Sequence, residues 1–287
     1  MIAVTTMYET DGRREQSKRE GVHDMLGAII GDIVGSRFER HNIKSKEFDF
    51  FAPDCLLTDD SIMTFAVAQA LLKCTGDYSA LGEKAVHYMQ TIGRIYPGCG
   101  FGGNFLWWVL GDSPEPYNSY GNGAAMRVSP CAYVASSLDE VIELSRKVTE
   151  VSHNHPEGIK GAEATAVATY MARTGRTIPE IKQYINDRYY PMDFTLDGIR
   201  TSYTLDVSCQ GSVPQAIMAF LESNSFEDAI RNAVSIGGDS DTIAAITGGI
   251  AGAYYGVPND IREKALSYMD RLQRKILCDF EEDLGVS

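Results

Sequence analysis

The stretch SIGGDSDTIAAITGGIAGAYYG, residues 235–256, decides the fold of this chain of 287 residues. Its second half lies in the longest uncharged apolar stretch of the sequence, Thr242 to Val257, which is 16 residues long and rich in glycine. A membrane span needs about 20 apolar residues, so this stretch is predicted to form a buried helix of a globular core.

Outward from this stretch the signals are almost all helical. Apolar residues recur at three- and four-residue spacing, and capping residues or a proline mark several helix starts. Helices are predicted for Asp59 to Leu72, after Ser137, from Pro156, after Ser225, for Asp239 to Tyr255 and for Asn259 to Leu277. Strand alternation competes only at Asp187 to Leu205, where we expect a short strand or an irregular loop.

The domain organisation follows from these signals. Residues 1–24 are polar and without periodicity, which predicts a flexible N-terminal extension. Residues 25–287 are predicted to form a single compact all-α domain. No internal repeat at solenoid spacing and no low-complexity segment is present.

Composition excludes several classes of function. The net charge of −13 argues against generic binding to nucleic acid or to an anionic membrane surface, but it is compatible with a bound cation. The first 20 residues carry mixed charges and no apolar core, so they do not resemble a secretory signal. The six cysteines are scattered without a C-x-x-C pair, which favours reduced thiols and a cytoplasmic protein.

Two acidic clusters fall where helices are predicted to begin. They are TDDS at residues 58–61 and GGDSDT at residues 237–242. One such residue is usually a helix cap, but two carboxylates in four residues repel each other unless a cation lies among them. The ligands are all hard oxygens, which favours Mg²⁺, Mn²⁺ or Ca²⁺ over zinc. If the clusters meet in space, they could hold two ions that activate a water molecule.

Three other segments carry weaker signals. SYGNGAAMR, residues 119–127, could cradle an anion through backbone N–H groups, although Asn-Gly is also a common turn. In GAIIGDIVGS, residues 27–36, glycines at every fourth position suit close helix packing, and a buried Asp32 would need a partner. His153 and His155 precede a helix and could be simple caps.

Together these segments resemble a known family. GAIIGDIVGSRFE, TDDS, SYGNGAAMR and SIGGDSDTIAAITGGIAGAYYG are similar, in content and order, to the motifs of the ADP-ribosylglycohydrolases. That family includes the enzymes that reactivate dinitrogenase reductase and the eukaryotic ADP-ribosyl-acceptor hydrolases. The resemblance covers residues 25–256 and implies an orthogonal helical bundle with two Mg²⁺ or Mn²⁺ ions at a cleft.

The resemblance also implies roles for individual residues. Glu39 matches an acidic residue near the scissile bond, and Asp60 or Glu39 would act on the attacking water or the leaving group. His153 matches a histidine that lines the ADP-ribose pocket, and Tyr117 or Phe101 could stack on adenine. The implied metal ligands are Thr58, Asp59, Asp60, Asp239, Asp241 and Thr242. The implied contacts to diphosphate and ribose are Ser119, Tyr120, Gly121, Asn122 and Gly123.

The implied activity is metal-dependent hydrolysis of the bond between ADP-ribose and a modified protein or other acceptor, with ADP-ribose as product. Two alternatives remain at this point: a metal-dependent phosphoesterase and a non-catalytic ADP-ribose-binding relative. SYGNGAAMR favours serine-linked or O-acyl-linked acceptors slightly over arginine-linked ones. The loop at residues 96–103 is expected to lie where acceptor specificity is set.

Overall fold

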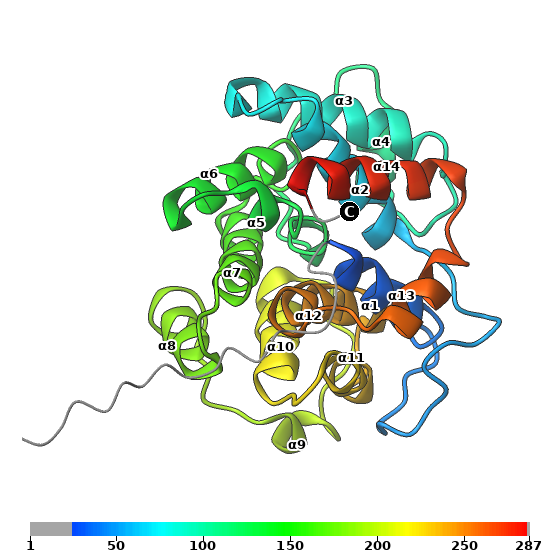
Figure 1. Ribbon diagram of the computed structural model, residues 1–287, viewed down its shortest axis with the longest axis vertical. Coiled ribbons are helices and arrows are strands. Elements are labelled where there is room, and N and C mark those ends of the chain that lie inside the picture. Colours follow the sequence, from blue (N-terminus) through cyan, green and yellow to red (C-terminus); the bar gives the residue numbers. More distant parts are fainter. Residues whose placement is uncertain (1–24, 286–287) are drawn as a thin grey trace, which may run out of the picture.

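The computed structural model describes residues 25–285, so the predicted extension at residues 1–24 lies outside the described part. The described part contains fourteen α-helices and two short 3₁₀ helices, Tyr78–Ala80 and Asn122–Ala124 (Figure 1). The α-helices are α1 (Leu26–Ser36), α2 (Asp59–Leu72), α3 (Leu81–Gly93), α4 (Gly103–Leu110), α5 (Cys131–Val134), α6 (Leu138–Thr149), α7 (Pro156–Arg173), α8 (Ile178–Arg188), α9 (Leu196–Ile199), α10 (Cys209–Leu221), α11 (Phe226–Ser235), α12 (Ser240–Tyr255), α13 (Asn259–Leu266) and α14 (Arg271–Leu284).

The all-α prediction is confirmed. Within residues 25–285 the only β-type pairing is an isolated bridge between Gly121 and Ser208. The segment from Asp187 to Leu205 contains the end of α8, the short helix α9 and irregular loops, so the loop alternative is the correct one there. In the same described range, no helix combines the length and the apolar character that crossing a bilayer requires.

Helix α12 forms the centre of the bundle. It packs against α1, α7, α10 and α11, which surround it in Figure 1. Every residue from 240 to 253 is buried, as expected for a helix that is apolar on all sides. The stretch at residues 235–256 thus contains the buried core helix that its sequence predicts.

The contact between α1 and α12 depends on the glycines of α1. A Cβ atom on Gly27 would lie 2.3 Å from the carbonyl oxygen of Gly248, and one on Gly31 would lie 1.9 Å from that of Ala244. Only glycine at these positions allows the two backbones to approach so closely. This approach brings Asp32, on α1, close to the first turn of α12.

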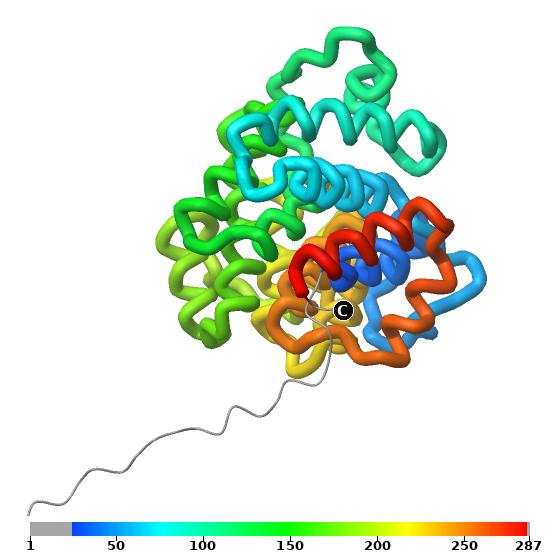
Figure 2. The backbone as a smooth tube through the Cα atoms, turned by 45° about the horizontal axis from the view of Figure 1, so that its top comes forward, coloured from blue at the N-terminus to red at the C-terminus, as the bar shows by residue number. Residues whose placement is uncertain are grey.

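Helix α2 carries the first acidic cluster and is held from two sides. It packs against α3 and against the C-terminal helix α14, which lies over α2 in Figure 1 and beside it in Figure 2. Leu277 and Phe280 of α14 are fully buried. Helix α2 is therefore held by helices from both halves of the chain.

One predicted helix is interrupted. The segment Asn259 to Leu277 consists of α13 and the start of α14, separated by residues 267–270. Asp270 begins α14 with a capping box, in which its side chain accepts from Gln273 N–H and the Gln273 side chain accepts from Asp270 N–H. The prediction of one continuous helix is wrong because this capping box starts a new helix.

Candidate active site

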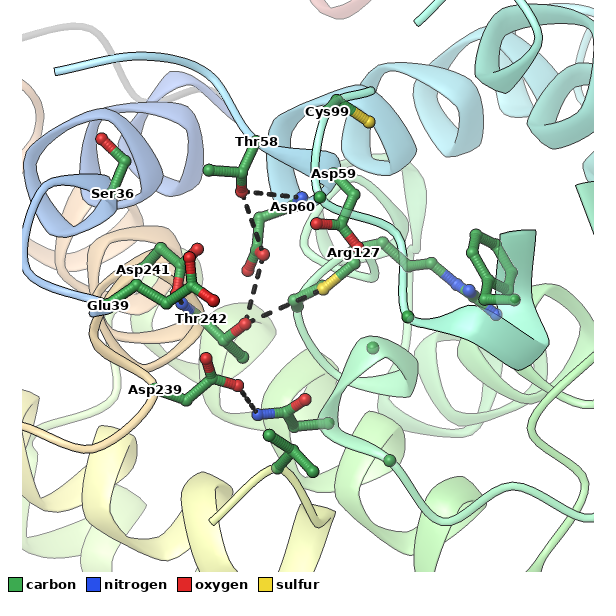
Figure 3. A pocket seen from close by; sticks show the side chains of 18 of the residues that line it. Ser36, Glu39, Thr58, Asp59, Asp60, Cys99, Arg127, Asp239, Asp241 and Thr242 are labelled. Atoms are coloured by element: carbon green, nitrogen blue, oxygen red, sulfur yellow. Dashed lines mark hydrogen bonds between the residues drawn. The ribbon is translucent and has the colours of Figure 1, made fainter. Parts of the chain in front are cut away.

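A cavity of about 730 Å³ opens at one end of the bundle, and both acidic clusters line it (Figure 3). Thr58, Asp59 and Asp60 come from the start of α2, and Asp239, Asp241 and Thr242 from the start of α12. The Thr242 hydroxyl donates to Oδ2 of Asp60 at 3.2 Å, which joins the two clusters directly. The expectation that the clusters meet in space is met.

Three buried carboxylates lie close together at the inner end of the cavity; Asp60 and Asp241 line it, and Asp32 lies beside them. Asp32, Asp60 and Asp241 each offer an oxygen within 4.8 Å of the other two. Oδ1 of Asp60 is buried and has no hydrogen-bond partner among the described residues. Burial, and then the charge of Asp241, raise the pKa of Asp60 well above its usual value. Hard oxygen donors, repulsion between them and an unpartnered buried oxygen all fit a divalent cation at this position.

Asp32 is the functional candidate that the sequence prediction did not include among the metal ligands. It accepts hydrogen bonds from the backbone N–H and the hydroxyl of both Thr58 and Ser61. Burial nevertheless raises the pKa of Asp32 to about 6. In the sequence, Asp32 stands out only as a carboxylate inside an apolar helix. That position predicts that Asp32 has a polar partner but does not identify the partner.

The cap interpretation holds for one cluster and fails for the other. Thr58 caps α2 by accepting from the Asp60 N–H at 3.3 Å. Asp239 occupies the N-cap position of α12 but makes no capping bond with its side chain. Its carboxylate instead accepts from the side-chain amide of Asn122 at 2.6 Å. Asp239 therefore belongs to the cavity and not to the helix end.

Asp59 lies at the mouth of the same cluster. It is half-buried, and burial followed by the charge of Asp32 raises its pKa to about 7. The loop at residues 96–103 passes close to it, since a Cβ on Gly100 would lie 2.7 Å from Oδ1 of Asp59. Gly98, Cys99, Gly102 and Gly103 of this loop also line the cavity.

Glu39 lines the cavity from an exposed position after α1, and Asn42 fixes its segment. The Asn42 amide donates to the carbonyls of Phe38 at 2.6 Å and Gly238 at 2.9 Å. Its oxygen accepts from Gly238 N–H at 2.7 Å. Asn42 thus ties the Glu39 segment to the turn that precedes Asp239, a role that no pattern in the sequence marks.

The glycine loop forms the opposite wall. Ser119, Gly121, Asn122 and Gly123 line the cavity. Asn122 is buried, and its backbone N–H donates to Val207 O at 2.8 Å, which attaches the loop to the segment before α10. Tyr120 is not part of the cavity wall; its ring is half exposed and lies 5.2 Å from the ring of His155.

His153 lies beneath this loop. It is buried, and its ring lies 5.6 Å from that of Tyr117 and 5.9 Å from that of Phe105. Burial lowers the pKa of His153 well below its usual value. Tyr117 lines the cavity, whereas Phe101 packs edge-on against Phe105, so Tyr117 is the better placed of the two aromatic candidates. His155 caps α7 by accepting from the Glu157 N–H.

The helical fold and the acidic cavity are those of a class of hydrolases that act on ADP-ribosyl bonds. A family model described as ADP-ribosylglycohydrolase matches residues 19–284, and the chain belongs to this family. The predicted family and the predicted hydrolase activity on ADP-ribosyl glycosidic bonds are thereby confirmed. The acidic group of Asp32, Asp60 and Asp241 is one that could bind a metal ion in such an enzyme.

Individual proteins support this assignment. ADP-ribosylhydrolase ARH3 of Homo sapiens is 28% identical over 307 residues, covering 81% of this chain and 84% of the relative. ADP-ribosylarginine hydrolase Tri1 of Pseudomonas putida is 29% identical over 286 residues, covering 85% and 72%. A solved structure described as an ADP-ribosylglycohydrolase-related protein complex has a TM-score of 0.65 at 20% identity, covers 91% of this chain and 94% of its own, and supports the fold.

Proposed function

We propose that this protein releases ADP-ribose from an ADP-ribosylated protein or small molecule, with two divalent ions, Mg²⁺ or Mn²⁺, in the acidic cavity. The observation that carries the proposal is the convergence of two acidic clusters opposite a glycine loop in one cavity. The proposed metal ligands are Thr58, Asp59, Asp60, Asp239, Asp241 and Thr242. When bound, such ions lower the pKa of a coordinated water and orient oxygen-rich substrates.

The reacting bond joins the anomeric carbon of the distal ribose to the acceptor. Its cleavage passes through a transition state with positive charge at that carbon, which neighbouring carboxylates stabilise. In this proposal Asp60, which lines the cavity beside the proposed ions, accepts the proton of the attacking water. The proposed role of Glu39, which is exposed and lines the cavity, is to assist the leaving group.

The other wall is proposed to bind the ADP-ribosyl group. Its residues are Ser119, Tyr120, Gly121, Asn122, Gly123 and His153. Backbone N–H groups in a glycine loop can approach phosphate oxygens closely. Because the Tyr120 ring faces His155, any contribution of Tyr120 comes through its backbone. The adenine would then stack on Tyr117, whose ring faces the same cavity.

The composition supports further parts of the proposal. The scattered cysteines favour a cytoplasmic location, and the net charge of −13 disfavours generic nucleic-acid binding. The acceptor linkage is the part that only an assay decides, because arginine-linked and other ADP-ribosyl bonds differ outside the shared ADP-ribose moiety.

The test is ADP-ribose release from matched arginine-linked and serine-linked ADP-ribosyl peptides, each with Mg²⁺, with Mn²⁺ and with EDTA. We expect release from one peptide, with a preference for the serine linkage, and its loss in EDTA. Asp60→Asn should lower turnover by at least about 100-fold. Asp193→Asn is the matched control, because Asp193 is exposed and does not line the cavity.

Two outcomes would contradict the proposal. One is undiminished release in EDTA, and the other is unchanged turnover in Asp60→Asn with an intact helical circular dichroism spectrum. Release of AMP or of inorganic phosphate instead of ADP-ribose would favour the phosphoesterase alternative. Binding of ADP-ribose without release from any peptide would favour a non-catalytic relative.

A further inference from the structure

Arg127 is a buried cation that forms no ion pair with a carboxylate of residues 25–285. Its side chain is fully buried, and Nε and Nη1 have no hydrogen-bond partner among the described residues. The guanidinium lies 5.3 Å from the ring centre of Phe105, and Figure 3 shows the side chain extending away from the carboxylates. Burying a charge without a partner of opposite charge is unfavourable in free energy. The hydrogen bonds that Arg127 does make are therefore informative about its role.

Nη2 of Arg127 donates to the carbonyl of Val148 at 3.3 Å and to Oγ of Ser152 at 2.8 Å. A guanidinium has only donors, so the Ser152 oxygen must be the acceptor in that bond. Oγ of Ser152 also lies 2.8 Å from Nδ1 of His153. The three side chains thus form a short chain of hydrogen bonds in which the fully buried Ser152 connects Arg127 and His153, two residues of the cavity lining.

The direction of the second bond follows from counting protons. The Ser152 hydroxyl has one proton, and within residues 25–285 its available acceptor is Nδ1 of His153. If Nδ1 carried a proton and donated to Oγ, the hydroxyl proton of this fully buried serine would have no acceptor. The arrangement therefore favours an unprotonated Nδ1, and the nearby Arg127 and burial oppose a charged imidazolium.

The proton of the neutral ring then resides on Nε2, which faces the glycine loop. A Cβ atom on Gly123 would lie 3.3 Å from Nε2, and one on Gly121 would lie 3.7 Å away. Among the described residues Nε2 has no hydrogen-bond partner of its own. A donor without a partner at a cavity wall suits an oxygen of a bound ligand.

We propose that Arg127 and Ser152 are positioning residues that hold His153 as its neutral Nε2–H tautomer, so that the ring donates a hydrogen bond to an oxygen of the ADP-ribosyl group. The identity of the ligand rests on the proposed function. The tautomer does not, because it follows from contacts within the protein alone.

The direct test is the ¹⁵N NMR spectrum of the histidine side chains in the full chain without ligand at pH 7. The protein has five histidines, and the His153→Gln variant identifies the signals of His153. We expect Nδ1 of His153 to be pyridine-like and Nε2 to be pyrrole-like. A proton on Nδ1, an averaged pair of signals or an imidazolium pattern would overturn the proposal.

The role of Ser152 is tested with Ser152→Ala. We expect the two ring nitrogen signals of His153 to move toward each other, and ADP-ribose affinity, measured by calorimetry with Mg²⁺, to fall about tenfold. Ser145→Ala is the matched control, because Ser145 is equally buried but donates to Ile142 O within its own helix. That variant should change neither measurement.

Unchanged ring signals and unchanged affinity in Ser152→Ala would exclude Ser152 as a positioning residue. If Ser152→Ala does not fold, the spectrum of the unmodified protein still decides the tautomer. If the unmodified protein shows the expected tautomer but does not bind ADP-ribose, the proposed ligand is wrong while the assignment of the hydrogen bonds stands.

Discussion

At the scale of single residues, His153 is a base kept neutral by its surroundings. The side chain is buried, Arg127 lies close by, and the pKa of the imidazole is well below its usual value. In the unfolded chain the same group titrates near pH 6.5. Below that pH the unfolded state binds a proton that the native state does not, so His153 lowers the stability of the fold as the pH falls.

The predicted loss of stability at low pH can be tested with the variant His153→Gln. Between pH 7.5 and pH 5.5 the original protein should lose about 1.4 kcal/mol more free energy of unfolding than the variant, since the variant has no group to protonate at this position. Urea unfolding of both proteins at the two pH values provides the measurement. Equal losses in the two proteins would show that His153 titrates normally in the folded state.

Residue types and their spacing predicted most of the cavity. The oxygen clusters at residues 58–60 and 239–242 were visible because each holds more carboxylates than a helix cap requires. Asp32 was recognisable only as a carboxylate in need of a partner. Its role depends on the approach of α1 to α2 and α12, which brings together residues far apart in the sequence, and local spacing contains no information about that approach.

At the scale of helices, the contact between α1 and α12 is the one that most restricts residue type. A Cβ on Gly31 would lie 1.9 Å from a backbone oxygen of α12, and backbone atoms in a central helix cannot move aside as a side chain end can. Gly82 in α3 differs, because a Cβ there would meet its nearest atom at 3.7 Å, an ordinary contact.

We therefore expect opposite effects from the same substitution. Gly31→Ala should lower the free energy of unfolding by about 3 kcal/mol or more through overpacking. Gly82→Ala should leave it unchanged or raise it by up to about 1 kcal/mol, because alanine favours the helix. Urea denaturation of the two variants beside the original protein measures both values, and similar effects of the two changes would contradict the close packing of α1 on α12.

The helices themselves were predictable to different degrees. The boundaries of α2 followed from apolar spacing and from the cap at Thr58. The break between α13 and α14 was missed although Asp270 and Gln273 form a readable capping box, because apolar spacing continues across it. Between Asp187 and Leu205 the tyrosines and threonines suggested a strand, but no neighbouring strand exists among the described residues to pair with it.

At the scale of the whole molecule, the acidic cavity joins the two halves of the chain. Asp60 belongs to the second helix and Asp241 to the twelfth; burial raises the pKa of both, followed by the charge of Asp241 for Asp60 and the charge of Asp239 for Asp241. A cation held between them would bind the folded protein and not the unfolded chain. Such binding stabilises the entire fold by mass action.

Thermal unfolding should report this coupling. At a free Mg²⁺ concentration about 100-fold above its Kd, the fold should gain about 2.7 kcal/mol, or a rise in Tm of several degrees. Asp241→Asn should show no such rise, and in EDTA its Tm should equal or exceed that of the original protein, since one repelling charge is gone. An undiminished Mg²⁺ effect in this variant would place the cation elsewhere.

The distance in sequence between the two ligand clusters has a consequence for synthesis of the protein. A ribosome must add more than 180 residues after Asp60 before Thr242 is available to bond with it. Nascent chains and N-terminal fragments that end between the clusters lack the central helix α12, whereas the complementary C-terminal fragments contain α12 but lack Thr58, Asp59 and Asp60. The proposed metal site can therefore form within a single polypeptide only when the chain extends from the first cluster through the second.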